Sequence, residues 1–214
     1  MSIGIIGSGG LGSSVARALG SKGIEATISN SRGPASLAAL VEEAGPSITA
    51  GTVQEAASAD IVLIAVRWVD AGAVLRSLPP FNGRVLIDGT NPVEFIDPDS
   101  AEAKDPSNPV GQYGIKAATL GDTHSSAIIS QFVPGARVVK AFNHLDVHVL
   151  SQPEASGGRR VLFYSGNDAG AKADVRKIIE AADFLPVDLG PLDVVGPLTS
   201  MPFGALSAIN FIAI

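Results

Sequence analysis

The stretch Gly7-Ser8-Gly9-Gly10-Leu11-Gly12 decides the fold class, because it carries the G-x-G-x-x-G pattern of a dinucleotide-binding turn. The run before it, Ser2–Ile6, is typical of a buried strand, and Gly10–Leu19 has apolar residues at helical spacing. In such a turn the first glycine permits the bend, the second admits the pyrophosphate, and the third brings helix and sheet together. The amide groups that open the helix then face the phosphates. We predict a dinucleotide site here; a plain glycine-rich connection is the alternative.

The end of the second predicted strand indicates which dinucleotide would bind. A strand over Glu25–Ser29 is followed by Asn30, Ser31 and Arg32. A site for NAD usually has a carboxylate there for the ribose 2′-hydroxyl, whereas a site for NADP has arginine and small polar donors for the 2′-phosphate. This chain has no acid at that point, and Arg32 can form a charge-assisted contact with a phosphate. We therefore predict NADP as the cofactor; a solvated loop arginine is the alternative.

Strand-like and helix-like segments alternate through the chain, which indicates a sheet with helices on both faces. We predict an α/β fold, namely a doubly wound Rossmann-type parallel sheet with a C-terminal helical extension. Residues 1–150 would form the NADP-binding Rossmann domain, and residues 151–214 an α/β extension and helical tail packed on it. The later predicted strands are Ile61–Val66, Arg84–Asp88, Arg137–Phe142, Val161–Ser165 and Pro186–Leu189, and the later predicted helices are Pro34–Glu43, Thr52–Ser58, Val69–Leu78, Ser125–Phe132, Leu145–Leu150 and Ala169–Ala182.

Two segments depart from the alternation. Asn91–Lys116 is rich in Pro, Asp and Ser and has no clear periodicity, which predicts a long irregular excursion. The tail from Val194 should be mostly helical, and Pro202–Ile212 is apolar nearly all round, so a helix there should be buried. Little chain is left to cover such a helix. We therefore predict a homodimer through this C-terminal helix, with packing on its own domain as the alternative.

Composition excludes several classes of function. The net charge of −6 argues against nucleic acid as the main partner, because a phosphate backbone needs a clustered basic surface. The chain has no cysteine, so disulfides, thiolate metal sites and cysteine nucleophiles are excluded. No stretch reads as a signal peptide or a membrane span. We expect a cytoplasmic protein with no membrane partner.

Further stretches are more specific than a generic dinucleotide fold requires. The chain has Asn30–Arg32 after the second strand, Ala65–Trp68 after the fourth, Asn91-Pro92, Lys140–Asn143, Ser165–Asp168 with Ala171-Lys172, and Pro186–Leu192. With these and Ile5–Gly12, the chain resembles the coenzyme F420-dependent NADP oxidoreductase family, which includes the NADPH-binding domain of the Steap metalloreductases. It departs from that family at Ser36, where relatives often carry a second basic residue, and in the long excursion.

The resemblance implies hydride exchange between NADP(H) and a second redox carrier, a flavin or a deazaflavin of the F420 type. It implies that Val66 and Trp68 border the NADP and that Asn91 and Pro92 line the nicotinamide pocket. Trp68 as a core aromatic is the alternative. The predicted cofactor-binding residues are Gly7, Ser8, Gly9, Gly10, Leu11, Gly12, Asn30, Ser31, Arg32, Val66, Trp68, Asn91 and Pro92.

Few side chains offer acid–base chemistry, as expected when a cofactor supplies the reactive atoms. The predicted catalytic residues are Asn143 and His144, which follow the strand that ends at Phe142. Asn143 would bond a carboxamide or a deazaflavin carbonyl, and His144 would donate a proton to a carbonyl acceptor; satisfying local backbone is the alternative for both. His148 lies four residues beyond His144, but with no obvious third ligand we predict no metal site.

Three functions remain open from the residues. The first is an NADPH-dependent oxidoreductase whose hydride acceptor is a flavin or deazaflavin. The second is a reductase of a small carbonyl or imine substrate, and the third is an NADP(H)-binding sensor without turnover. In each of the enzyme readings the partners are NADP(H) and a small-molecule hydride acceptor.

Overall fold

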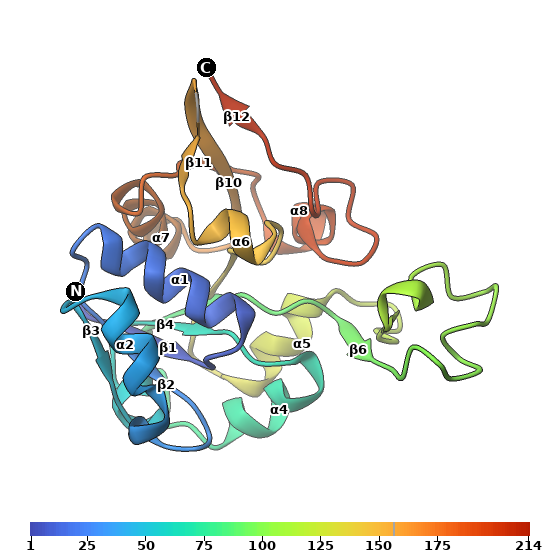
Figure 1. Ribbon diagram of the computed structural model, residues 1–214, viewed down its shortest axis with the longest axis horizontal. Helices are drawn as coiled ribbons and strands as arrows, with labels where there is room; N and C mark the ends of the chain where they lie inside the picture. The colour runs from blue at the N-terminus through green and yellow to red at the C-terminus, as the bar shows by residue number, and fades with distance from the viewer. Residues whose placement is uncertain (156) are drawn as a thin grey trace.

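The computed structural model describes residues 1–155 and 157–214 and has a central, mostly parallel sheet between two layers of helices (Figure 1). The strands of its main path lie in the order β11-β10-β8-β5-β4-β1-β2-β3, and only the β10–β8 pair on that path is antiparallel. The order reverses between β1 and β4, where open α/β sheets bind ligands. These strands are β1 (Ile3–Ile6), β2 (Ala26–Ser29), β3 (Ile48–Ala50), β4 (Ile61–Ile64), β5 (Val85–Asp88), β8 (Arg137–Ala141), β10 (Gly158–Gly166) and β11 (Leu185–Asp188).

Two hydrophobic cores lie on opposite faces of this sheet. Ile3 and Ile5 of β1 join the core under one layer of helices, whereas Ile6 joins the core under the other. This alternation follows from the period of two in a strand. The helices are α1 (Gly10–Ser21), α2 (Ala38–Ala44), α3 (Val53–Ala57), α4 (Trp68–Arg76), α5 (Ser125–Phe132), α6 (Val147–Leu150), α7 (Ala169–Ala181) and α8 (Leu192–Thr199), with a 3-10 helix η1 (Pro34–Leu37) before α2.

Local sequence explains where several helices begin. The hydroxyl of Thr52 accepts a hydrogen bond from the Glu55 amide, and the Glu55 carboxylate accepts one from the Thr52 amide. This reciprocal capping box satisfies amides that have no partner inside α3. The carboxylate of Asp168 caps α7 in the same sense by accepting from Ala171. The predicted Rossmann-type fold is confirmed.

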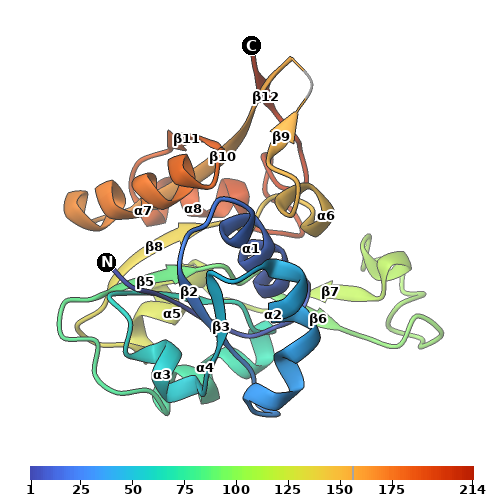
Figure 2. The ribbon, with the colours of Figure 1, turned by 60° about the vertical axis from the view of Figure 1, so that its left-hand side comes forward.

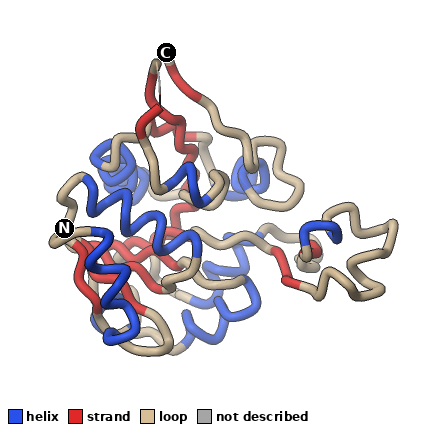
Figure 3. The backbone as a smooth tube through the Cα atoms, in the orientation of Figure 1, coloured by secondary structure: helices blue, strands red, loops and turns tan. Residues whose placement is uncertain are grey.

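The predicted irregular excursion contains a short hairpin. β6 (Val93–Phe95) pairs antiparallel with β7 (Ile115–Ala117), and a 3-10 helix η2 (Gly111–Tyr113) precedes β7. We call residues 93–117 the arm, because they project away from the sheet (Figure 2) and consist mostly of loops and turns between the two strands (Figure 3).

The C-terminal tail differs from the prediction. It is helical only in α8, after which turns lead to β12 (Ile212–Ala213), which pairs antiparallel with β10 near β9 (Glu154–Ala155). The predicted buried helix over Pro202–Ile212 is wrong. Proline and glycine at Pro202 and Gly204 disfavour helix there, and Phe203 is 64% exposed. The predicted homodimer was argued from this helix, so that argument no longer applies, and the homodimer stays a prediction.

Across the described part of the chain, no helix combines the length and apolar character that crossing a bilayer requires.

Candidate cofactor-binding site

A cavity of about 820 Å³ lies along the carboxyl edge of the sheet, and we call it the first cavity. The loops after β1, β2, β4, β5 and β8 all contribute to its wall, as expected at the switch point of a doubly wound sheet. The structure brings most of the predicted site residues together there, namely Gly7, Ser8, Gly9, Gly10, Leu11, Asn30, Ser31, Arg32, Val66, Trp68, Asn91 and Asn143. Gly12, Pro92 and His144 lie outside its lining.

Each glycine of the turn meets a different requirement. Gly7 has φ 109°, and a Cβ on it would clash with the carbonyl oxygen of Ala65. A Cβ on Gly12 would clash with the carbonyl oxygen of Gly7, so Gly12 sets how closely α1 approaches the turn. At Gly9 a Cβ would meet nothing within 4 Å, because this position faces open space. The three roles expected of the motif thus fit the geometry, with Gly12 acting from behind the cavity wall.

The loop after β2 is held by Asn30. The Asn30 side-chain amide donates to the hydroxyl of Ser8 at 3.1 Å, and its carbonyl oxygen accepts from the backbone amide of Arg32 at 2.9 Å. Asn30 is buried, whereas Ser31 and Arg32 are exposed. Among the described residues, the Arg32 guanidinium forms no ion pair, so its donors are available to an anion.

Position 36, where the family resemblance expects a base, has a structural role here. The Ser36 hydroxyl lies 2.9 Å from the side-chain nitrogen of Asn30 and donates to the carbonyl of Gly33 at 2.7 Å. Serine at this position therefore supports the loop and brings no charge. Arg32 is left as the cation of this loop.

The loop after β4 forms another wall of the first cavity. Trp68 opens α4, is half-buried, and packs in part against the hydrophobic core while it also lines the cavity. It is thus both a core aromatic and a cavity residue. Arg67 pairs with Asp70 at 2.8 Å, and both side chains are substantially exposed at the rim.

The opposite end of the first cavity is formed by two asparagines. Phe142, which directly follows β8, has φ 67°, a left-handed conformation that costs a side chain on the order of 1–3 kcal/mol. This bend brings Asn143 to the cavity. The Asn143 side-chain nitrogen donates to the Asn91 side-chain oxygen at 3.0 Å and to the Thr199 carbonyl at 2.8 Å.

These two bonds fix the orientation of the Asn143 amide, because both partners are acceptors. The side-chain oxygen of Asn143 is buried and has no hydrogen-bond partner among the described residues. Asn143 is 4% exposed, and a buried acceptor without a donor is costly. Asn143, which lines this end of the cavity, therefore carries one acceptor that is fixed in orientation and unfilled among the described residues.

Asn91 connects this end to the C-terminal tail. Its side-chain nitrogen donates to the Asn143 carbonyl at 2.7 Å, and its side-chain oxygen accepts from the Met201 amide at 3.0 Å. Thr199 and Met201 therefore belong to the site, although the sequence reasoning missed both. No sequence motif marks them, since their contacts to Asn91 and Asn143 span 56 to 110 residues.

A buried ion pair supports the same loop from below. Lys140 lies 3.0 Å from the Asp88 carboxylate and donates to the Thr90 carbonyl at 2.8 Å, and both charged side chains are almost wholly buried. Burial raises the pKa of the Asp88 carboxyl, but the Lys140 charge and hydrogen bonds from Thr90 and Ser126 outweigh burial and hold that pKa below its usual value. The pair is therefore charged and fixes the backbone just before Asn91.

His144 points away from the first cavity. It is 1% exposed, and its Nε2 accepts from the backbone amide of Phe163 at 3.0 Å. Burial lowers its pKa to about 4, so the ring is neutral near pH 7. These contacts do not support the proton donor that we expected. The described residues contain no cluster of three potential metal ligands.

Known proteins are similar to this chain in sequence and in fold. Residues 2–92 match the family model described as NADP oxidoreductase coenzyme F420-dependent. The hypothetical protein SMa0349 from Sinorhizobium meliloti is 36% identical, with a TM-score of 0.85, over 100% of this chain and 97% of its own. Over residues 2–92 the chain therefore matches the coenzyme F420-dependent NADP oxidoreductase family, which is a family of NADP-dependent oxidoreductases.

More distant structures share the fold. A candidate F420-dependent NADP reductase from Arthrobacter sp. FB24 is 24% identical, with a TM-score of 0.66, over 90% of this chain and 86% of its own. A reductive aminase from Aspergillus terreus, solved with NADPH and ethyl-5-oxohexanoate, is 20% identical, with a TM-score of 0.59. That match covers 89% of this chain and 55% of the aminase, so this chain spans about half the length of that protein.

Proposed function

We propose that NADPH binds in the first cavity with its 2′-phosphate at Arg32 and its nicotinamide at Asn143. The backbone amides that open α1 would face the pyrophosphate, because Gly9 leaves open space there and no side chain caps this helix. Arg32 and Ser31 would hold the 2′-phosphate, since both are exposed at the cavity and Arg32 is free of acidic partners among the described residues.

The unfilled acceptor of Asn143 is the observation that carries the proposal. Its side-chain oxygen would accept a hydrogen bond from the carboxamide NH2 of the nicotinamide, which is a donor of the required type. This geometry favours the carboxamide over a deazaflavin carbonyl as the partner of Asn143, because a carbonyl has no hydrogen to give. Asn91 and Met201 would then border the nicotinamide.

We propose that the acceptor of the hydride is a flavin or a deazaflavin of the F420 type. The family description supports such a carrier. When bound, NADPH supplies the hydride, and a ring acceptor requires no proton donor from the protein. The residues of this chain would act by placement, which contributes on the order of 7–11 kcal/mol in well-oriented reactions. Val93 and Phe95, at the base of the arm, line the same cavity and offer an apolar surface to a ring.

A titration tests the proposal in two steps. The protein is titrated with NADPH and with NADH while nicotinamide fluorescence is followed, and a deazaflavin or flavin is then added to the NADPH complex. We expect NADPH to bind more tightly than NADH and its absorbance to fall when the carrier is added. Binding without oxidation by any carrier would contradict the proposed acceptor, and no binding of either nucleotide would contradict the site itself.

A further inference from the structure

A second cavity, of about 320 Å³, lies beside the nicotinamide end of the first. Its wall comes from the base of the arm, from the loop before α5, and from the tail after α8. Met201 lines both cavities, and Pro92, which lines the second, follows Asn91 of the first. A ligand in the second cavity would therefore lie next to whatever is bound against Asn91 and Met201.

The lining of the second cavity is largely apolar and includes one imidazole. Ala118, Leu120 and Phe203 contribute apolar surface, and His124 lies among them. The Nδ1 atom of His124 accepts a hydrogen bond from the Ala127 amide at 3.3 Å, where it caps α5. A ring whose Nδ1 is an acceptor carries its proton on Nε2. Among the described residues Nε2 has no hydrogen-bond partner. The Nε2–H group of His124 can therefore donate a hydrogen bond to a ligand in this cavity.

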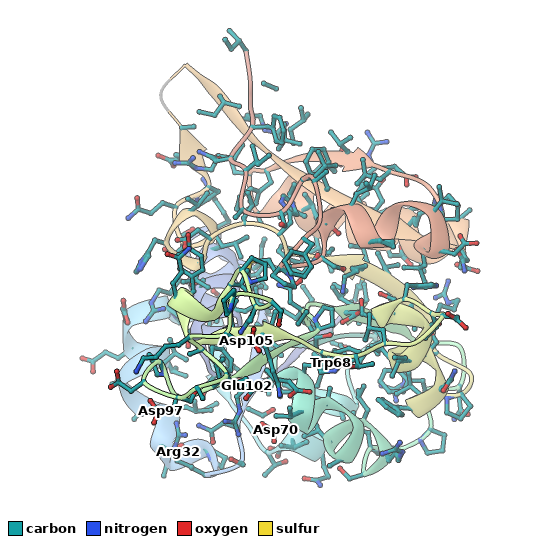
Figure 4. All side chains as sticks on the ribbon, turned by 90° about the vertical axis from the view of Figure 1, so that its right-hand side faces the viewer. Arg32, Trp68, Asp70, Asp97, Glu102 and Asp105 are labelled. Atoms are coloured by element: carbon teal, nitrogen blue, oxygen red, sulfur yellow. The ribbon has the colours of Figure 1, made fainter. Side chains whose placement is uncertain are left out.

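Charge near the arm disfavours an anionic ligand. Both lysines of the arm are already paired, Lys116 with Glu94 and Glu102, and Lys104 with Asp99. Figure 4 looks onto the side from which the arm projects and labels three of its acids with Asp70 of the cavity rim. The arm carries five carboxylates against these two lysines, namely Glu94, Asp97, Asp99, Glu102 and Asp105. None of these acids lines the second cavity, but among the described residues its lining has no lysine or arginine either, so a ligand with a carboxylate or phosphate tail would find no cationic side chain there.

We propose that the second cavity binds a small uncharged aldehyde or ketone and that the protein reduces it. The carbonyl oxygen would accept the Nε2 hydrogen of His124, and the carbonyl carbon would contact the nicotinamide beside Met201, where the linings of the two cavities meet. This activity rests on the proposed binding of NADPH in the first cavity. It goes beyond the proposed carrier, because the substrate is a small neutral carbonyl compound. A volume of about 320 Å³ lies at the lower end of the range for small-molecule sites.

The reaction balances with the groups named. The C4–H bond of the dihydronicotinamide breaks with its electron pair, and a C–H bond forms at the carbonyl carbon. The carbonyl oxygen takes a proton from water, which gives the alcohol, NADP⁺ and a hydroxide ion that leaves to solvent. His124 keeps its protons throughout and stabilises the negative charge that develops on the oxygen, as a neutral imidazole can when it donates a hydrogen bond.

The first experiment measures NADPH oxidation with cyclohexanone, a panel of neutral aldehydes and ketones, and a carboxylated analogue of each. We expect turnover of neutral compounds, with kcat/KM at least tenfold lower for each carboxylated analogue. Binding of cyclohexanone is also followed by NMR on the protein without nucleotide, at the amide of Ala127. Shifts there without NADPH binding would support the cavity and contradict the proposed function. NADPH binding with no shift and no neutral carbonyl reduced would overturn the inference.

Two variants test the residues. His124→Asn keeps a side-chain oxygen that can cap α5, because asparagine is a good capping residue, but removes the Nε2 donor. We expect kcat/KM for the carbonyl to fall about 100-fold, as when an oxyanion donor is removed, with NADPH affinity unchanged. His148→Asn, on an exposed histidine, is the matched control.

Ala118→Phe fills the second cavity and should abolish carbonyl turnover while NADPH still binds. Its control is Ala101→Phe, at an exposed position of the arm outside both cavity linings. Wild-type turnover in both His124→Asn and Ala118→Phe would overturn the assignment of this cavity.

Discussion

The two ends of the first cavity are built from different kinds of contact. At the glycine end, the wall comes from the continuous run Gly7–Leu11 and from Asn30–Arg32, which follows the adjacent strand β2. At the asparagine end, Asn91, Asn143 and Met201 come from segments that lie far apart in the chain and meet through side-chain hydrogen bonds. The glycine end therefore depends on backbone shape, and the asparagine end on tertiary contacts that cross the domain.

The largest effect should follow from breaking the buried ion pair under the asparagine end. In Lys140→Met the Asp88 carboxylate stays buried without its cation, and removing one partner of such a pair costs about 3–5 kcal/mol of unfolding free energy. Chemical denaturation measures the change. The partly exposed pair Arg17–Glu43, which joins α1 to α2, is the control, and Arg17→Met should cost about 1 kcal/mol or less.

A double variant separates charge from packing in this pair. Asp88→Asn with Lys140→Met removes both charges and keeps an oxygen for the Thr90 hydroxyl. We expect it to recover part of the stability lost in the single variant, because no uncompensated charge remains. If the double variant were less stable than Lys140→Met, the cost would come from lost packing and the ion-pair argument would fail.

The next largest effect is a pH dependence of the unfolding free energy that is caused by protonation of His144. The pKa of His144 is about 4 in the folded protein against 6.5 for the free side chain, so the unfolded chain binds more protons between these values. Stability from this group is therefore complete above about pH 6.5 and is lost as pH falls toward 4, by up to about 3 kcal/mol. Denaturation of wild type and His144→Gln across this range measures it. Parallel curves for the two proteins would show that His144 does not titrate in this way.

The contrast between the two ends explains how much the sequence could predict. The glycine turn and Asn30–Arg32 are short continuous runs whose geometry is local, so the sequence alone could predict that they lie together at the cavity. Asn143 and His144 are neighbours in the sequence, but the structure turns one to the cavity and the other into the core. Thr199 and Met201 could not be found, because their place depends on contacts formed only in the folded chain.

The tail shows the same limit at the level of the fold. The apolar pattern of Pro202–Ile212 predicted a buried helix, but a pattern does not show what a segment packs on. The amide of Leu206 donates to the carbonyl of Leu198, and that of Ala208 to the carbonyl of His144, so backbone groups of the tail bond across loops. Helices α1, α5 and α7 were predicted well because their apolar residues repeat at helical spacing.

At the glycine end, Arg32→Ala should weaken NADPH binding by roughly 10- to 100-fold, the range for a hydrogen bond to a charged group. NADH affinity should change little, because NADH has no 2′-phosphate. Arg67→Ala is a matched control, since Arg67 lines the same cavity but is paired with Asp70. Fluorescence titration of both nucleotides with both variants gives the comparison. Equal losses for NADPH and NADH would assign Arg32 to the loop fold rather than to the phosphate.

The smallest expected effect tests whether the glycine end and the asparagine end of the first cavity bind the two ends of NADPH independently. Asn143→Leu keeps the size of the side chain but removes the acceptor that we assign to the nicotinamide carboxamide, together with the two hydrogen bonds that the Asn143 nitrogen donates to Asn91 and Thr199. Loss of the bond to the ligand should lower NADPH affinity about fivefold, the effect of one hydrogen bond of roughly 1 kcal/mol. Adenosine 2′,5′-bisphosphate, which has no nicotinamide, should bind as it does to wild type. If both ligands weakened equally, Asn143 would act through the fold of the whole cavity, and the two ends would not be independent.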